Sequence, residues 1–423
     1  MNTELKPAER VIGLDAHPDS FTAAILRGPT PAAAITEKMF DKVPLGNLLS
    51  WAKKNTTPKD RLVLEASGNS FQIVRQLATI EREALVLESC HLGKLKEAHA
   101  NNDKISALRI AKAYLAGTAK IVWLPDPKTQ ERRDLFHAHR KSVKRATQAR
   151  NSLLSYLSDN GVRLKPGTSL TGPKGEATLK AAADWSPRQW QILEGLLLQL
   201  RHADQQRRHW RNLIAQEVLA DAQLLSLVRL CGVRDLVAFA LMAFIGDIKR
   251  FAGPKQLVKY VGLNPAFDDS GNGTWVGGIG GHGRNDLRCL LVEGAQAILR
   301  CSATPLAHWG KKLMARKGSR NLAVAAMARR LTVAVWYLLM GRWTPLEEIN
   351  DQLAIKITKI IGHVTPEAQK LLGTSPRQLR DEASRKLKDV TLYCLNPNPK
   401  QFVRQPCKPK TAPAPAVAVA QDA

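Results

Sequence analysis

The sequence predicts an α/β domain followed by all-α, mainly helical domains in one chain. Over roughly the first hundred residues, short apolar runs suited to buried strands alternate with helical patterns. From about Asn101 onward the pattern becomes helical. The length of 423 residues, at roughly 100–200 residues per domain, predicts two or three domains.

Short apolar runs mark the elements of the N-terminal region. Strands that alternate with helices favour parallel pairing within one sheet. The expected strands are residues 11–14, 21–26, 62–64 and 84–87, and the expected helical segments are residues 48–52 and 71–80.

The following segments predict two long helices and a loop. Asn102 is suited to cap a helix that ends near residue 115. After Pro125 and Pro127, a long helix is expected over residues 129–157, and a loop rich in Gly, Pro, Ser and Thr is expected over residues 161–175.

A second long helix begins at Ser186 and Pro187, which fit the cap and the first helical position. It reaches about residue 220, and its charged middle, residues 201–208, cannot all be buried. We therefore expect a projecting helix that is half of an antiparallel coiled coil. The sequence leaves open whether the other half comes from the same chain or from a partner.

The remaining chain predicts a second globular region and a tail. Residues 224–261 are helical in pattern, residues 268–284 form a Gly-rich turn, and residues 285–340 are helical again. Pro, Lys, Ala and Val dominate the tail, which cannot bury a core. The expected parts are an α/β domain with a basic helix (8–160), a linker and coiled-coil helix (161–222), a domain with a serine loop (223–342), a helical extension (343–395) and a disordered tail (396–423).

The charge balance indicates a polyanionic partner. Lys and Arg number 63 against 37 Asp and Glu, which gives a net charge of +26. This excess is too large for a typical metabolic enzyme and indicates nucleic acid or an anionic membrane. Hydrophobic residues make up 44% of the chain, enough for globular cores.

Membrane insertion is disfavoured. The longest apolar stretch, residues 322–340, contains Arg329 and Arg330, and the N-terminus lacks the apolar core of a signal peptide. The six cysteines are scattered without metal-binding spacing. We therefore expect a cytoplasmic, soluble protein that binds nucleic acid and no membrane.

The long helix over residues 129–157 carries a basic run. Between residues 128 and 150 there are eight basic residues against Glu131 and Asp134. Such a run is either a solvated face or a phosphate-binding face, and the global charge favours phosphate contact. The basic residues are Lys128, Arg132, Arg133, Arg140, Lys141, Lys144, Arg145 and Arg150.

Two carboxylates each close an expected strand. Asp15 follows residues 11–14 and Glu65 follows residues 62–64. If the two strands are parallel neighbours, both acids lie at one edge of the sheet, where Mg²⁺ finds the oxygen ligands it prefers. Asp103, at a helix start, is a third candidate. The alternatives are a solvated acid at a turn and a charge that stabilises the helix terminus.

Ser270 lies in the Gly-rich turn, followed by Gly271. Its hydroxyl is a candidate nucleophile for a phosphate, and Arg284 and Arg288 downstream are suited to stabilise the charge that develops. Possible bases are Asp268, Asp269 and His282. The alternative is a surface turn, since Ser, Gly, Asn and Asp are the residues that turns prefer.

The order and spacing of several motifs together resemble one family. Residues 11–15 (Val-Ile-Gly-Leu-Asp), 64–68 (Leu-Glu-Ala-Ser-Gly) and 102–107 (Asn-Asp-Lys-Ile-Ser-Ala) are similar to its acidic motifs. Residues 133–140, Asn151 and Gly161 resemble its basic linker helix, and residues 260–265, 270–271 and 283–288 resemble its C-terminal signature. The family is the DEDD insertion-sequence transposases of the IS110 group, the bridge-RNA-guided recombinases.

This resemblance, over about residues 11–342, implies a ribonuclease-H-like (RuvC-like) N-terminal domain joined through a coiled coil to a helical transposase domain. It implies Mg²⁺ held by Asp15, Glu65 and Asp103, and Ser270 as a nucleophile that forms a transient 5′-phosphoserine link to DNA. It also implies a homo-oligomer, from dimer to tetramer, and a structured non-coding guide RNA that pairs with donor and target DNA.

The chain departs from the family pattern at Ser106. The third acidic motif usually reads Asp-x-x-Asp, and Ser106 stands where the second Asp falls. A serine hydroxyl is a poor, uncharged ligand for Mg²⁺. Either three carboxylates and water suffice, or metal affinity is reduced, or this copy is impaired; Asp126 is one possible substitute.

Four functions are therefore weighed. The main hypothesis is a transposase that cuts and rejoins DNA strands. The alternatives are a site-specific DNA invertase of the same family, a metal-dependent junction nuclease that uses water, and a catalytically impaired copy that only binds nucleic acid.

Overall fold

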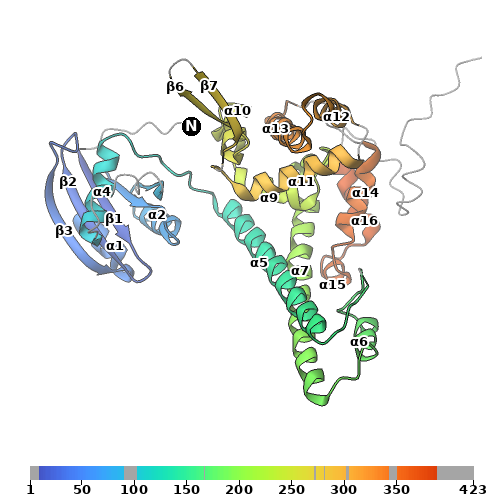
Figure 1. Cartoon of the computed structure of the whole chain (residues 1–423). Helices are drawn as coiled ribbons and strands as arrows, with labels where there is room; N and C mark the ends of the chain where they lie inside the picture. The colour runs from blue at the N-terminus through green and yellow to red at the C-terminus, as the bar shows by residue number, and fades with distance from the viewer. Residues whose placement is uncertain are drawn as a thin grey trace, which may run out of the picture. The chain divides into compact units, whose positions relative to one another are not determined.

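The computed structural model describes residues 9–89, 102–165, 167–270, 273–280, 282–301, 304–342 and 350–387. The chain forms two compact units that divide between Pro125 and Asp126 (Figure 1). We expected one domain over residues 8–160, but the structure places residues 126–160 in the second unit. The reason is that the helix over these residues packs along a later helix of that unit.

The N-terminal unit is built on one mixed sheet of five strands in the order β3-β2-β1-β4-β5. β1 pairs with β4, and β4 with β5, in parallel, as predicted. β1 pairs with β2, and β2 with β3, in the antiparallel direction, so the parallel prediction covers only part of the sheet. The strands are β1 (Arg10–Ala16), β2 (Ser20–Arg27), β3 (Ile35–Pro44), β4 (Arg61–Glu65) and β5 (Ala84–Leu87).

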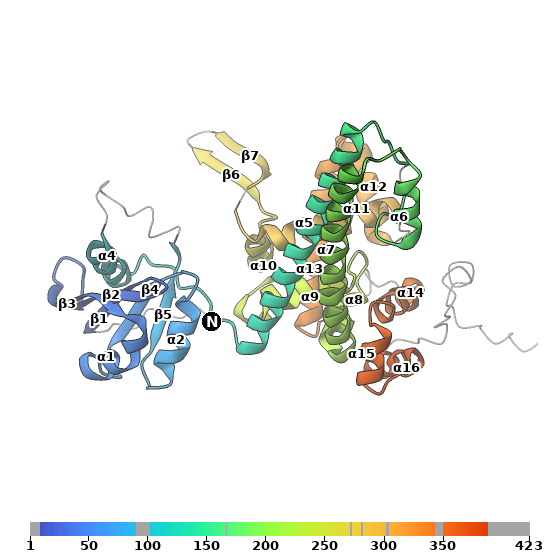
Figure 2. The same cartoon turned by 90° about the horizontal axis from the view of Figure 1, so that it is seen from below.

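Helices cover both faces of this sheet (Figure 2). On one face, the short 3₁₀ turn η1 (Leu45–Asn47) leads into α1 (Leu48–Asn55), which packs with α2 (Ser70–Ala78) on Ile12, Leu14 and Phe21. On the other face, α4 (Asp103–Leu115) packs on Val11 and Val63. Both helices expected here before residue 100 are confirmed, as is the cap of α4, where the Asn102 side chain accepts a hydrogen bond from the Ile105 N–H.

Strand β3 was not among the expected strands. This strand lies at the edge of the sheet, and most of its residues are exposed. An edge strand buries little of either face, so its sequence lacks the apolar alternation that marks a half-buried strand.

The C-terminal unit begins with an antiparallel pair of long helices, α5 (Pro127–Asp159) and α7 (Pro187–Ala220), which lie side by side in Figures 1 and 2. At the far end the Tyr156 hydroxyl donates to the Gln189 carbonyl (3.2 Å), and α6 (Pro173–Lys180) lies beside them. The second half of the expected coiled coil therefore comes from the same chain. We call this pair the helical hairpin.

The predicted cap of α7 is confirmed, and α5 has a cap that was not predicted. Ser186 forms a capping box with Gln189 at the start of α7. Asp126 caps α5 by accepting hydrogen bonds from the backbone and the hydroxyl of Thr129. Asp126 is therefore the N-cap of α5. It belongs to a different compact unit from Asp15.

The body of the C-terminal unit is helical, as predicted. Its core gathers apolar side chains from the base of the hairpin and from most of the later helices. These helices are α8 (Ala222–Val228), α9 (Asp235–Ile245), η2 (Ile248–Arg250), α10 (Pro254–Val261), α11 (Asn285–Cys301), α12 (Pro305–Lys317), α13 (Arg320–Leu339), α14 (Asn350–Ile361), α15 (Pro366–Leu371) and α16 (Pro376–Lys386).

The Gly-rich segment is more ordered than a turn. It contains two antiparallel strands, β6 (Pro265–Ser270) and β7 (Gly273–Ile279), joined by residues 271–272, which lie outside the described residues. We call these strands the serine hairpin. The tail expected over residues 396–423 also lies outside the described residues.

One described helix, α13, is long and apolar enough to cross a membrane by length and composition. Half of its most apolar window is buried, and Met327, Leu331 and Val335 belong to the C-terminal core. Helix α13 is thus packed as a core helix of this unit.

Candidate active site

Asp15 and Glu65 lie at the same edge of the N-terminal sheet. Leu14 of β1 pairs with Leu64 of β4 in parallel register, and the two acids are the next residues on each strand. Because side chains alternate along a strand, both acids project to the face that Val11 and Val63 share, which is the face that α4 covers. The two parallel strands are thus neighbours, as the metal-site hypothesis requires.

The first turn of α4 lies over this edge. Asp103 is the first residue of α4. Gly13 permits the approach, since a Cβ at this position would lie 2.0 Å from the carbonyl oxygen of Ala107. The Lys104 ammonium also pairs with the Asp41 carboxylate of β3 at 3.2 Å, which ties the same turn to the sheet.

The structure brings Asp15 and Asp103 together and adds His17 to them. Ligand atoms of the three residues lie within 4.8 Å of one another. The His17 Nε2 atom lies 3.5 Å from Asp103 Oδ1 and 3.9 Å from Asp15 Oδ2. Ser106, one turn along α4, is hydrogen-bonded through its side chain to Asp15. We call Asp15, His17, Glu65, Asp103 and Ser106 the acidic-edge site.

His17 was not among the predicted site residues. The sequence offered one indication of its role. His17 is two residues after Asp15, and side chains two residues apart lie on the same face of a strand. The spacing was insufficient because residue 17 lies beyond the last residue of β1, and only the turn to β2 decides where its side chain goes.

The electrostatics of the acidic-edge site favour a bound cation. Burial raises the pKa of Asp15, while His17 acts in the opposite direction. The negative charges of Asp103 and Glu65 raise this pKa further, and the Ser106 hydrogen bond lowers it. On balance the pKa is raised, so the carboxylates are held together at an electrostatic cost that a divalent cation would offset.

Ser270 lies in the C-terminal unit, as the last residue of β6, where it pairs with Gly273 across the serine hairpin. Its neighbours Asp268 and Asp269 pair with Trp275 and Thr274. The hairpin register thus brings Ser270 to the turn end of two strands rather than into a loop.

Arg284 and Arg288 organise the chain just after the serine hairpin. The Arg284 guanidinium lies over the Phe244 ring, 4.2 Å from its centre, and Nη2 is 3.3 Å from Asp286 Oδ2. Arg288 donates from Nη1 to the His282 carbonyl (3.0 Å) and from Nη2 to Asn285 Oδ1 (2.9 Å). Both side chains therefore stabilise the connection between β7 and α11.

The C-terminal unit matches a known protein family. Residues 226–309 match the family described as "Transposase IS116/IS110/IS902 family". The chain thus carries a segment similar to this transposase family, and that segment includes Ser270, Arg284 and Arg288.

Individual relatives agree with this assignment. The chain is 26% identical to "Transposase for insertion sequence element IS1111A" of Coxiella burnetii over 287 residues, which are 67% of this chain and 78% of that protein. It is 21% identical to "Transposase for insertion sequence element IS1328" of Yersinia enterocolitica over 78% of this chain and 96% of that protein. It is 30% identical to "Probable family 20 transposase" of Pseudomonas aeruginosa over 30% of this chain and 38% of that protein.

Three of the arginines predicted to bind nucleic acid are engaged within the fold. Arg132 is buried and pairs with Glu217 (2.5 Å) and Asp221 (2.6 Å) of the C-terminal end of α7. Arg133 donates to the Ala243 carbonyl at 2.9 Å. Arg140 pairs with Asp286. The structure thus gives these three side chains roles in holding α5 to the unit.

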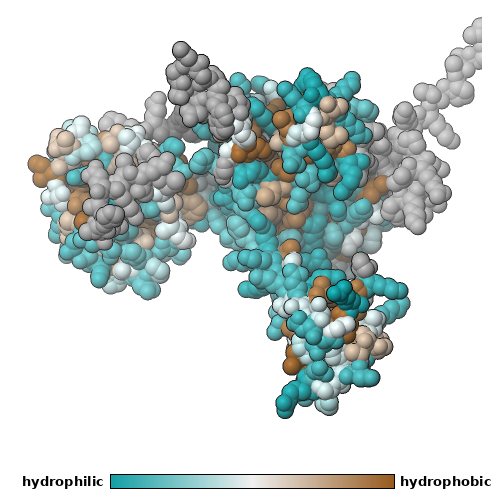
Figure 3. All heavy atoms as spheres, viewed as in Figure 1, coloured by the Kyte–Doolittle hydropathy of each residue, from teal (hydrophilic) through white to brown (hydrophobic). Residues whose placement is uncertain are grey.

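The other predicted cations on α5 remain exposed. Lys141, Lys144, Arg145 and Arg150 have no acidic partner within 4.0 Å among the described residues. We call these four residues the basic face. Hydrophilic side chains also dominate the middle of the helical hairpin in the face of the molecule shown in Figure 3.

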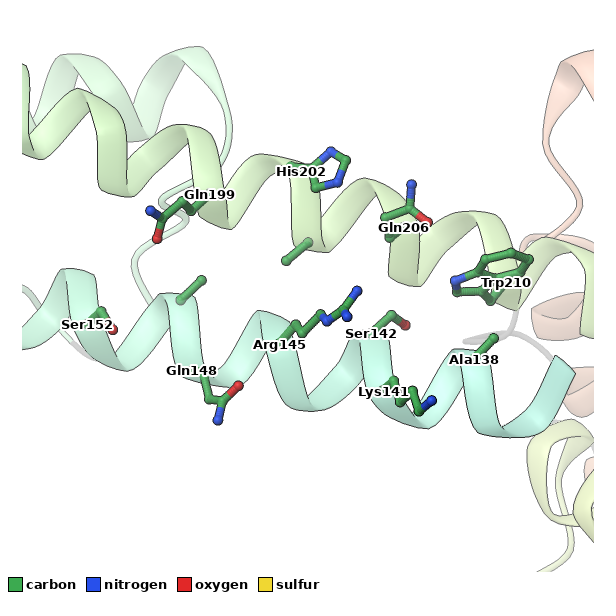
Figure 4. Close-up of a pocket in the computed structure, with 12 residues that line it drawn as sticks. Ala138, Lys141, Ser142, Arg145, Gln148, Ser152, Gln199, His202, Gln206 and Trp210 are labelled. Atoms are coloured by element: carbon green, nitrogen blue, oxygen red, sulfur yellow. The ribbon is translucent and has the colours of Figure 1, made fainter. Parts of the chain in front are cut away.

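Part of the basic face borders a cleft between α5 and α7 (Figure 4). The cleft has a volume of about 480 Å³. Lys141 and Arg145 line it from α5, and Gln199, Gln206 and Trp210 line it from α7. The two helices pack through apolar residues at the tip and at the base of the hairpin, and the cleft lies between these two regions.

Proposed function

We propose that this chain is a transposase that cleaves and rejoins the DNA strands of an insertion sequence, with Mg²⁺ held by Asp15, Glu65 and Asp103 and with Ser270 as the nucleophile. One observation carries the proposal. Acids from β1 and α4 converge at the edge where β4 ends in Glu65, in a chain whose C-terminal unit matches a transposase family.

The N-terminal unit is proposed to have a ribonuclease-H-like fold. The support is its topology: the first three strands are antiparallel, the last two are parallel to β1, and the order is β3-β2-β1-β4-β5. In such a sheet, the acidic residues of the central strands meet at the carboxyl ends of the parallel strands, where α/β sheets bind ligands.

The acidic-edge site fits a divalent cation by its chemistry. It offers carboxylate oxygens from two strands and a helix, and burial, together with the negative charges of Asp103 and Glu65, raises the pKa of Asp15. A bound Mg²⁺ would stabilise negative charge on the phosphoryl group during displacement. Asp15, Glu65 and Asp103 would hold that ion at one edge of the sheet.

Ser270 is proposed to form the covalent intermediate. Its Oγ attacks the phosphorus of a phosphodiester, the Oγ–P bond forms, and the bond from phosphorus to the 3′ oxygen breaks. The serine proton passes to water, and the 3′ oxygen takes up a proton to become a hydroxyl. The 3′ hydroxyl of another strand then attacks the phosphoserine and releases the serine hydroxyl, so the bond is restored without ATP.

Nucleic-acid contacts are proposed for the basic face and for Arg284 and Arg288. The basic face is suited to phosphates because its charges are exposed and have no acidic partners within the described residues. The proposed partners are donor and target DNA, a structured non-coding guide RNA and further copies of the chain, from dimer to tetramer.

The test is an adduct assay. Purified protein, its flanking non-coding RNA and labelled target DNA are incubated with Mg²⁺ and then denatured. We expect a protein–DNA adduct that is lost in Ser270→Ala and in Asp103→Asn, while Ser270→Ala binds DNA and RNA with near wild-type affinity, because one hydroxyl adds little to many phosphate contacts.

The other outcomes separate the alternatives. Cleaved DNA without an adduct would indicate a nuclease that uses water. An absence of any product that Ser106→Asp restores would indicate an impaired copy. Inversion of a segment between two sites, without excision of an element, would indicate an invertase. Each of these outcomes overturns the proposal as stated.

A further inference from the structure

We propose that His17 is a nitrogen ligand of the metal bound at the acidic-edge site, and that this site therefore prefers Mn²⁺ to Mg²⁺. The inference rests on the proposed function, since it concerns the same metal site. It concerns a residue that was not among the predicted ligands, and it adds an imidazole to a set of three carboxylates.

The position of the His17 ring carries the inference. Its Nε2 atom faces two acids at once, at 3.5 Å from Asp103 Oδ1 and 3.9 Å from Asp15 Oδ2. These acids come from different elements, α4 and β1. The three ligand atoms lie within 4.8 Å of one another, so small side-chain movements suffice for all three to reach one ion.

The backbone of His17 is fixed on both sides. Its N–H donates to the Ser20 carbonyl (2.8 Å) in the turn from β1 to β2. Its carbonyl accepts a hydrogen bond from the Asn69 side chain (2.9 Å), which lies in the loop after Glu65. The Ser67 hydroxyl in turn donates to the Asn69 side-chain oxygen at 3.0 Å. The loop that follows one acid therefore holds His17 beside the other two.

Because residue 106 is a serine, α4 supplies no second carboxylate to the site, and His17 can be the additional ligand. Ser106 is neutral, and its side chain is hydrogen-bonded to Asp15, so it adds no charged ligand on the α4 side. With His17 included, the site offers three carboxylates and one imidazole. Mg²⁺ prefers oxygen ligands alone, whereas Mn²⁺ accepts a nitrogen ligand more readily and binds mixed sites more tightly.

The inference is tested on the full chain without nucleic acid. Calorimetric titration with Mn²⁺ and with Mg²⁺ is carried out on the wild type, His17→Gln, His17→Asp and Asp103→Asn. His209→Gln is the matched control, because His209 is an exposed histidine on α7, in the other compact unit. Pulsed electron spin resonance of bound Mn²⁺ detects whether a ¹⁴N nucleus is coordinated, independently of any activity.

We expect the wild type to bind Mn²⁺ about tenfold or more tightly than Mg²⁺, with a ¹⁴N signal. His17→Gln should lose the ¹⁴N signal and weaken Mn²⁺ binding about tenfold, with a smaller effect on Mg²⁺. His17→Asp should reverse the preference toward Mg²⁺, and His209→Gln should match the wild type. Since His17 is half-exposed, these variants should fold, which circular dichroism checks.

Two results would overturn the inference in distinguishable ways. If Asp103→Asn abolishes metal binding but His17→Gln binds Mn²⁺ with wild-type affinity and an unchanged spin-resonance spectrum, His17 is no ligand and the proposed function stands. If the wild type binds neither ion at a site sensitive to Asp103→Asn, the proposed metal site fails and the role of His17 fails with it.

Discussion

Gly13 of β1 lies directly beneath the backbone of Ala107 in α4, so closely that a Cβ at residue 13 would lie 2.0 Å from the Ala107 carbonyl oxygen. One turn before Ala107, the same helix carries Asp103 to Asp15. The absence of a side chain at residue 13 therefore sets how near the helix acid comes to the strand acid.

Gly13→Ala should consequently separate the two acids. The added methyl group has no space, because the atom it meets is backbone, and α4 must move away from β1. We expect a loss of about 1–3 kcal/mol in the free energy of unfolding and weaker metal binding. Thermal unfolding and calorimetry measure both effects.

The matched control is Gly68→Ala, because no atom lies within 4 Å of a Cβ there. It should leave stability and metal binding almost unchanged. Equal behaviour of the two variants would contradict the account of Gly13.

Ser106→Asp should make the N-terminal unit more dependent on metal. The new carboxylate lies beside Asp15, so without metal it should cost about 1 kcal/mol through like-charge repulsion. With the ion present it adds a ligand, and Mg²⁺ affinity should rise about tenfold. Ser106→Ala is the control, since it removes the hydrogen bond without adding charge. An unchanged Mg²⁺-induced rise in Tm would argue against the position of Ser106 in the metal site.

Arg132→Ala should affect stability more than nucleic-acid binding. It leaves Glu217 and Asp221 without their buried partner, at a cost of about 2–3 kcal/mol. The value is reduced because both carboxylates are partly exposed. Lys141→Ala, an exposed cation of the same helix, should leave the free energy of unfolding within about 0.5 kcal/mol. Chemical denaturation of the two variants measures the difference, and equal stability would refute the structural role of Arg132.

Replacing all four residues of the basic face (Lys141, Lys144, Arg145 and Arg150) by alanine should reduce the salt dependence of DNA binding. Each phosphate contact contributes about 0.9 to the slope of log K against log salt, so four contacts lower it by about 3.6. Binding measured by fluorescence anisotropy at several salt concentrations gives the slope. An unchanged slope would mean that this face is only solvated.

His139 should make the C-terminal unit sensitive to acid. Burial in α5 lowers its pKa from 6.5 to about 4, and Arg211 and Arg207 contribute to the decrease. In the unfolded chain His139 is protonated as the pH falls below about 6.5. In the folded chain it is protonated only near pH 4. Stability is full above pH 6.5 and falls by about 3 kcal/mol as the pH drops toward 4.

His139→Gln should remove this part of the pH dependence. Urea unfolding between pH 4 and pH 7 measures it in both proteins. Some dependence should remain, because burial also lowers the pKa values of His137 and His363. Parallel curves for the variant and the wild type would contradict the assignment to His139.

Sequence patterns predicted those elements whose ends are set by interactions between residues close in the chain. Asn102 and Ser186 cap the helices that they were expected to cap, because a cap depends on a side chain and the backbone two or three residues away. The apolar runs of β1 and β4 likewise predicted the strands that end at Asp15 and Glu65. The edge strand β3 carries no such signal, since most of it faces solvent.

The sequence by itself determined which residues carry charge and where strands and helices begin. The tertiary structure decided which of those charges are available. Arg132 and Arg145 lie on the same helix, yet only Arg132 pairs with acids, which are 85 and 89 residues away in the chain. His17 likewise lies in the acidic-edge site because the turn from β1 to β2 places it beside Asp15 and α4 brings Asp103 to it. Burial and long-range pairing depend on distant segments, and no local pattern encodes them.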